Sequence, residues 1–129
     1  MKEIIYGQIL AKANHYQAVP GKGGKRIIKD EKIRAYERSF ASQCRIYKGR
    51  NISGRFRLHV TVWHSSVRFD LDNSLKTILD CLQSVEAITN DNLCFGIEAE
   101  KRIDKCNPRI EFRKEIINEQ LCITTEKEQ

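Results

Sequence analysis

The sequence predicts one small α/β domain of the α+β type, in which two helices pack on one face of a mixed or antiparallel β-sheet. Residues 55–64 alternate apolar and polar side chains without interruption, which is typical of a half-buried strand. Residues 68–82 place their apolar side chains at helical spacing, which predicts an amphipathic helix. The predicted order is β-α-β-α-β-β in a single domain over residues 1–129, with 116–129 as a polar C-terminal tail.

The N-terminal part is predicted to be a strand followed by a flexible basic loop. Residues 3–10 are apolar and β-branched enough for a strand. The following segment contains Pro20 and three glycines among lysines and arginines, which favours a loop that grips phosphates. Its GKGGK run lacks the GxxxxGK[ST] order and no strand leads directly into it, so no nucleotide cofactor is expected.

The remaining elements follow from the spacing of apolar residues. Residues 30–44 form a first helix, and residues 93–103 form a strand whose inward side chains are Leu93, Phe95, Ile97 and Ala99. The Asn-Pro turn after it predicts a hairpin with a last strand around residues 110–112.

The net charge of +6 is unevenly divided along the chain. Residues 1–68 hold 15 basic and 4 acidic side chains, whereas residues 69–129 hold 8 basic and 13 acidic ones. This division favours a basic surface for a polyanion beside an acidic site, although a solubilising surface accounts for the charge equally well. No stretch is apolar enough for a membrane span or a signal peptide, and five scattered cysteines without a CxxC pair suit a reducing cytoplasm.

A group of acidic residues surrounds the second predicted helix. Asp72, Lys76 and Asp80 are four residues apart and share one face, and Asp70 lies at the expected N-cap. Asp91 precedes the next strand, so it is expected to meet Asp70 and Asp72. Singly, each residue has an ordinary structural role as a cap, a turn residue or a surface ion pair.

Together, these side chains indicate a metal-dependent phosphoryl site. Three close carboxylates repel one another unless a cation joins them, and hard oxygen ligands suit Mg²⁺, with Mn²⁺ as a substitute. Such a metal polarises a phosphate and activates water, while Lys76 would stabilise the charge that develops on phosphorus.

The runs FDLDNSLKTILDCL, TNDNLCFGIEAEKR and NPRIEF resemble the RusA family of Holliday-junction resolvases over roughly residues 3–113. The family signature reads approximately D-x-D-N-x-x-K-x-x-x-D-x-L, followed by a D-D-x-x-I segment. It is matched here by Asp70, Asp72, Asn73, Lys76, Asp80 and Leu82. Upstream, Asn14-His15-Tyr16 beside the basic loop is similar to the Asn-containing N-terminal segment of the family.

The resemblance implies a homodimeric, Mg²⁺-dependent endonuclease that cuts four-way DNA junctions. Asp70, Asp72 and Asp91 would be the metal ligands, Lys76 the catalytic cation, and Asp80 more structural. The paired aspartates of the family are Asn90-Asp91 here, which weakens the expected metal affinity. The candidates for DNA binding are Lys22, Lys25, Arg26, Lys29, Arg34 and Arg68.

Two other functions remain open from the sequence. One is a non-catalytic DNA-binding accessory protein of the same fold, although clustered carboxylates would bring no advantage to a pure DNA binder. The other is a metal-dependent nuclease for flaps or other branched DNA, which sequence patterns do not separate from junction resolution.

Overall fold

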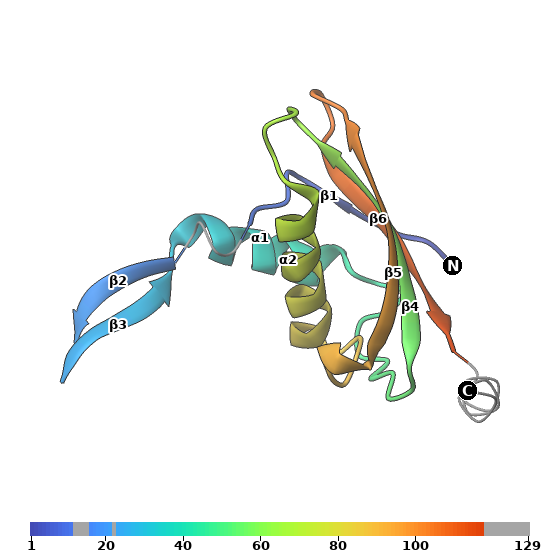
Figure 1. Ribbon diagram of the computed structural model, residues 1–129, viewed down its shortest axis with the longest axis horizontal. Coiled ribbons are helices and arrows are strands. Elements are labelled where there is room, and N and C mark those ends of the chain that lie inside the picture. The colour runs from blue at the N-terminus through green and yellow to red at the C-terminus, as the bar shows by residue number, and fades with distance from the viewer. Residues whose placement is uncertain (12–15, 22, 118–129) are drawn as a thin grey trace, which may run out of the picture.

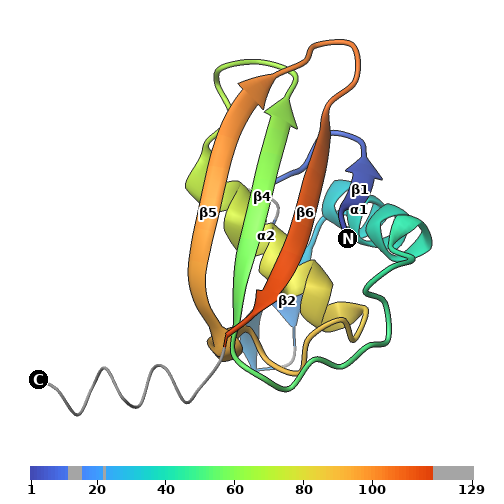
Figure 2. The same cartoon turned by 90° about the vertical axis from the view of Figure 1, so that its right-hand side faces the viewer.

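The computed structural model describes residues 1–11, 16–21 and 23–117 and confirms the predicted fold class. A mixed four-stranded sheet carries two helices on one face (Figures 1 and 2), and a separate two-stranded hairpin projects from this body (Figure 1). No helix in the described part of the chain is long and apolar enough to cross a membrane. The elements are β1 (Glu3–Tyr6), β2 (Tyr16–Gly21), β3 (Gly24–Lys29), α1 (Glu31–Gln43), β4 (Phe56–His64), α2 (Leu71–Ser84), the 3₁₀ helix η2 (Asp91–Leu93), β5 (Cys94–Ile103) and β6 (Arg109–Ile116).

Strand β4 lies inside the sheet and confirms the predicted alternation. Its buried side chains are separated by partly exposed ones along the whole strand. The sheet order is β1-β6-β4-β5, in which β4 pairs with β6 antiparallel and with β5 parallel. The buried row faces the helices and forms the centre of the core with residues of α1 and α2.

Both helices begin and end close to the predicted positions. Asp30 caps α1 by accepting a hydrogen bond from the backbone N–H of Ile33 at 3.0 Å. Helix α1 buries Ile33, Tyr36 and Phe40, as its spacing predicts. In α2 the predicted apolar stripe packs against the core, with Ile78 fully buried.

The expected hairpin between the last two strands is wrong. Strand β6 pairs with β4 and β1, and β5 lies on the other side of β4. The Asn-Pro turn therefore connects two strands that run on either side of β4, so the two sequence neighbours do not share a ladder. Strand β4 is the partner of both β5 and β6. Its strictly alternating side chains bury one whole row against the helices, which places β4 in the middle of the sheet.

The expected inward row of β5 is also wrong in part. Phe95, Ile97 and Ala99 are exposed, and Leu93 is partly buried in η2. Strand β5 is at the edge of the sheet, and α2 crosses behind only part of its length (Figure 2). An alternating pattern predicts which residues share a face, but it does not reveal whether another element covers that face.

The predicted basic loop is instead the hairpin of β2 and β3. The two strands pair antiparallel from Tyr16 with Lys29 to Gly21 with Gly24. Gly23 and Gly24 have φ angles of +81° and +135°, and glycine adopts such turn conformations without strain. The glycines therefore form a tight turn, and the β-branched residues beside them extend as strands.

Strand β1 is shorter than expected, and its Glu3 anchors the chain that follows α1. The strand ends before Gly7, which has a φ of +112°. The carboxylate of Glu3 is buried and accepts hydrogen bonds from the backbone N–H groups of Arg45 at 3.0 Å and Ile46 at 2.7 Å. The thiol of Cys44 also donates to it at 3.4 Å, and burial together with this carboxylate raises the pKa of that thiol to about 11. One acidic side chain thus provides the acceptor for the backbone N–H groups just after the end of α1.

We expect Glu3→Ala to lower the free energy of unfolding by about 2–3 kcal/mol, because several N–H groups would lose their buried acceptor. Glu3→Gln keeps an acceptor oxygen and should cost less. Urea denaturation of the three proteins measures both differences. Equal stability of Glu3→Ala and the unchanged protein would exclude this anchoring role.

Candidate active site

Helix α2 carries the predicted acidic face from its first residue. Asp70 is at the N-cap position, but its carboxylate makes no capping hydrogen bond. Instead, that carboxylate accepts a hydrogen bond from the side-chain amide of Asn73 at 3.3 Å, and Asp72 accepts from the backbone N–H of Asn73 at 2.9 Å. Asp70 and Asp72 are both exposed, so their oxygen atoms are accessible to a ligand from solvent.

The ammonium of Lys76 lies between two carboxylates in the middle of this face. Its Nζ is 3.4 Å from Asp80 and 3.4 Å from Asp91. The charge of Asp80, followed by the hydrogen bonds to Asp91 and Asp80, raises the pKa of Lys76 above its usual value. Lys76 is therefore a positive charge that remains mostly exposed to solvent at neutral pH.

Asp91 is held beside α2 by the short helix η2. The side chain of Asn90 caps η2 by accepting from the backbone N–H of Asn92 at 3.0 Å. The backbone N–H of Asp91 donates to the side chain of Gln83 at 3.1 Å. The amide oxygen of Asn90, which stands where the family has the first of its paired aspartates, thus has a structural role in this arrangement.

The structure divides the predicted acidic residues into two groups. Asp91 meets Lys76 and Asp80, whereas Asp70 and Asp72 are joined through Asn73 at the start of α2. At 1.5 Å per residue, Asp70 is about 9 Å from Lys76 along the helix axis. Within residues 1–11, 16–21 and 23–117, no three His, Cys, Asp or Glu side chains are close enough to hold one metal ion. The expected meeting of Asp91 with Asp70 and Asp72 is therefore absent here.

The predicted DNA-binding residues are spread over three elements. Arg34 is exposed on α1, and Arg68 is exposed in the connection before α2. Lys22 lies outside the described residues. The other three are on β3: Lys25, Arg26 and Lys29.

A set of side chains that the sequence did not indicate surrounds the connection from β4 to α2. The ammonium of Lys101 donates to the backbone carbonyls of Val67, at 2.9 Å, and Phe69. The buried His64 stacks on Phe69 with ring centroids 5.2 Å apart and lies 3.2 Å from the hydroxyl of Ser74. Burial, followed by the charge of Lys101, lowers the pKa of His64. These contacts depend on backbone carbonyls and on strands distant in sequence, so no local spacing signals them.

The open face of the sheet, opposite the helices, has a shallow groove of about 380 Å³. Two ion pairs lie in it, His59 with Glu98 at 2.9 Å and Lys2 with Glu111 at 3.1 Å. The acidic face of α2 is on the other side of the sheet, so this groove is not part of the candidate site.

Comparison with known proteins gives the family. A family model described as "Endodeoxyribonuclease RusA" matches residues 7–113, which include the whole acidic face of α2 and Asp91. A crossover junction endodeoxyribonuclease RusA from Aquifex aeolicus (strain VF5) is 30% identical over 96 residues, which cover 73% of this chain and 74% of that relative. The chain therefore belongs to the RusA family of endodeoxyribonucleases.

Proposed function

We propose that this protein resolves Holliday junctions by Mg²⁺-dependent hydrolysis of phosphodiester bonds in the cytoplasm. The observation that carries the proposal is the face of α2, where the Lys76 ammonium lies between carboxylates inside the family-matched region. The relative from Aquifex aeolicus is named a crossover junction endodeoxyribonuclease, which supports four-way DNA as the substrate class.

The ligands of the metal ion in this proposal are Asp70, Asp72 and Asp91. All three offer carboxylate oxygens of the kind that Mg²⁺ and Mn²⁺ prefer. Because Asp91 is paired with Lys76 and lies apart from Asp70 and Asp72, binding one ion with all three requires Asp91 to approach the start of α2. The carboxylate of Asp70 is at a helix N-cap without a capping hydrogen bond, which leaves oxygen atoms for a cation. When bound, the ion supplies Lewis-acid polarisation of the phosphate and a water of lowered pKa.

Lys76 is the catalytic cation in this proposal. Its raised pKa keeps the side chain protonated, and its exposure leaves the ammonium able to reach a phosphate. Such a charge stabilises the negative charge that develops on the phosphoryl oxygens during hydrolysis. Its ion pair with Asp91 directs the ammonium toward that carboxylate before the substrate binds.

The basic residues hold the DNA backbone. The hairpin of β2 and β3 projects from the body of the domain on the side of the helices (Figure 1), where a duplex arm could lie along it. Lys22, Lys25, Arg26 and Lys29 belong to this segment, and the set also includes the exposed Arg34 on α1 and the exposed Arg68, two residues before Asp70. Phosphate contacts of this kind position the substrate and carry no sequence information.

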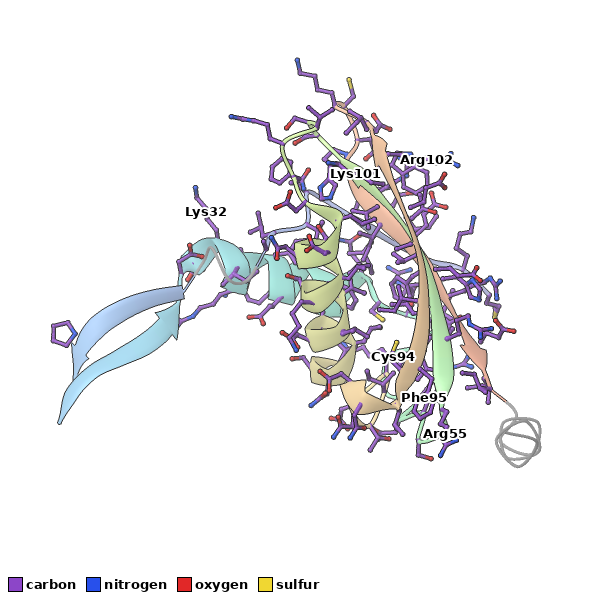
Figure 3. The ribbon with its side chains drawn as sticks, viewed as in Figure 1. Lys32, Arg55, Cys94, Phe95, Lys101 and Arg102 are labelled. Carbon is purple, nitrogen blue, oxygen red and sulfur yellow. The ribbon has the colours of Figure 1, made fainter. Side chains whose placement is uncertain are left out.

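A homodimer is proposed because a four-way junction has two equivalent strands to cut. Strand β5 offers a face for a second copy, since it is a ten-residue edge strand. Phe95, Ile97 and Ile103 are exposed on it, and Figure 3 shows Phe95 beside Arg55 at one end of the strand. An uncovered edge strand of this length presents unpaired backbone groups that another strand can pair with, although the charged residues of β5 would have to match across such an edge.

The decisive experiment compares cleavage of a labelled four-way junction, a flap and a matched duplex, each with Mg²⁺ and with EDTA. Paired symmetrical cuts in the junction that require the metal would support the proposal. Preferential cutting of the flap would identify a nuclease for other branched DNA, and binding without any cutting would identify an accessory protein.

We expect Asp72→Asn to abolish junction cleavage and to leave junction binding in EDTA unchanged or slightly tighter. The substitution keeps the volume of the side chain but removes one ligand charge and its repulsion of phosphates. Glu100→Gln, which removes a carboxylate from β5, is the matched control and should cut normally. Cleavage by Asp72→Asn at the unchanged rate would remove Asp72 from the site.

We expect neutralisation of Lys22, Lys25 and Arg26 to weaken junction binding at all sequences alike. Each lost phosphate contact should reduce the slope of log affinity against log salt by about 0.9, so by up to about 2.7 for the three. Neutralising the exposed Arg45, Lys48 and Arg50 in the same way is the control. A reduced slope in the control alone would move the DNA-binding surface to that segment.

We expect sedimentation equilibrium to give a mass of 30 kDa, twice the chain mass of 15.0 kDa. Phe95→Glu combined with Ile103→Glu should shift the protein toward the monomer, because two charges would meet their copies across the edge of β5. Ile116→Glu alters an exposed apolar residue on β6 and should leave the dimer intact. An unaltered mass in the double variant would exclude β5 as the dimer edge.

A further inference from the structure

The connection between β4 and α2 determines where Asp70 lies. It consists of residues 65–70 and has no regular structure until α2 begins at Leu71. The carboxylate of Asp70 makes no capping hydrogen bond to the backbone of the helix, and its one contact with α2 described above is the 3.3 Å hydrogen bond from the Asn73 side chain. The position of this carboxylate therefore depends on how the backbone before it is held.

Lys101 holds that backbone from the adjacent strand. Its ammonium donates to the carbonyls of both Val67 and Phe69, three residues and one residue before Asp70. Lys101 pairs in register with Val62 on β4, so its side chain points to the helix face of the sheet. Figure 3 shows Lys101 at the end of the sheet where this connection runs. Charge-assisted hydrogen bonds of this kind are about twice as strong as neutral ones.

A second group of contacts holds the two ends of the connection. The hydroxyl of Ser74 donates to the carbonyl of Asp70 at 2.9 Å, and the side chain of Gln8 accepts from the backbone N–H of Ser65 at 2.8 Å. The ring of Phe69 stacks on His64. The connection is therefore held at both of its ends, and its middle is held by Lys101.

We infer that Lys101 is a positioning residue for the hydrolytic reaction, because its ammonium sets the place of the Asp70 carboxylate through the carbonyls of Val67 and Phe69. The inference rests on the proposed function, in which Asp70 is a ligand of the catalytic metal. Lys101 does not touch the reacting atoms in this role. A misplacement of about 1 Å at a reacting centre can cost about 10²-fold in rate, so a small shift of residues 65–70 would be measurable.

The other role open to a lysine in a DNA-cutting enzyme is to bind phosphate. Two of the three N–H groups of Lys101 are already donated to backbone carbonyls, which leaves one for any other acceptor. Lys105, exposed in the turn after β5, carries the same charge nearby without these two contacts. A comparison of Lys101 and Lys105 variants therefore distinguishes a positioning role from a general electrostatic attraction to DNA.

The test compares Lys101→Met, Lys101→Arg and Lys105→Met in the full chain. Three quantities are measured: the single-turnover cleavage rate of a four-way junction at saturating enzyme with Mg²⁺, the junction affinity in EDTA, and hydrogen exchange of the amides in residues 65–70. We expect Lys101→Met to cut about 10–100-fold more slowly. Its affinity for the junction should change no more than that of Lys105→Met, and its amides in residues 65–70 should exchange faster.

Lys101→Arg should restore most of the rate and the protection from exchange, because a guanidinium can also donate to two carbonyls. If Lys101→Met unfolds, Lys101→Arg is the test. A folded arginine variant with a normal cleavage rate and normal protection from exchange supports the positioning role, and a folded one that has lost both contradicts it. An unchanged single-turnover rate in Lys101→Met would overturn the inference. Equal losses of affinity in both methionine variants with a normal rate would likewise overturn it in favour of phosphate binding. If the unchanged protein cuts no junction, the proposed function fails, and exchange in residues 65–70 still reports whether Lys101 holds the connection.

Discussion

The two-residue alternation of β4 is the constraint on which the rest of the structure depends. Its buried row supplies the surface on which both helices pack, and its two edges supply the ladders for β5 and β6. Strand β4 ends at the buried His64, so the connection to α2 starts from a residue that is fixed in the interior. The acidic face of α2 is thus oriented by a strand that contains none of the proposed catalytic residues.

The position of α2 separates positive and negative charge within a small domain. Its core-facing stripe packs against the sheet, so its charged face turns toward solvent at Asp72, Lys76 and Asp80. The basic residues are mostly in the first half of the chain, and part of them belong to the hairpin that projects from the body. A polyanion can therefore be bound at a distance from the carboxylates that would repel it.

The parts of the fold with strong local periodicity were predictable from sequence. The alternation of β4 and the helical spacing in α1 and α2 gave these elements and their buried faces correctly. The partners of β5 and β6 were not predictable in this way. Local sequence allows these two strands to pair with each other, and only the packing of the whole domain places β4 between them. The β2–β3 hairpin resembles a loop in sequence, because its glycines and proline indicate a turn more strongly than its short apolar runs indicate strands.

The candidate site was predictable to a similar extent. Spacing alone placed Asp72, Lys76 and Asp80 on one face, and Asp91 does reach Lys76. The separation of Asp91 from Asp70 depends on where η2 packs along α2, which no sequence pattern specifies. The role inferred for Lys101 depends on backbone carbonyls, whose positions are a product of the fold.

The pairing of β1 with β6 has a consequence for how the protein is made. Glu3 on β1 lies opposite Phe112 on β6, so β1 can pair in the sheet only after β6 has been synthesised. The segment from β4 to β5 contains all the acidic residues of the site and can form its parallel ladder earlier. A nascent chain that has not reached Arg109 therefore carries all the side chains proposed for catalysis but lacks the strand that joins β4 to β1. Completion of the sheet therefore depends on contacts between strands far apart in the sequence, and such long-range contacts form slowly.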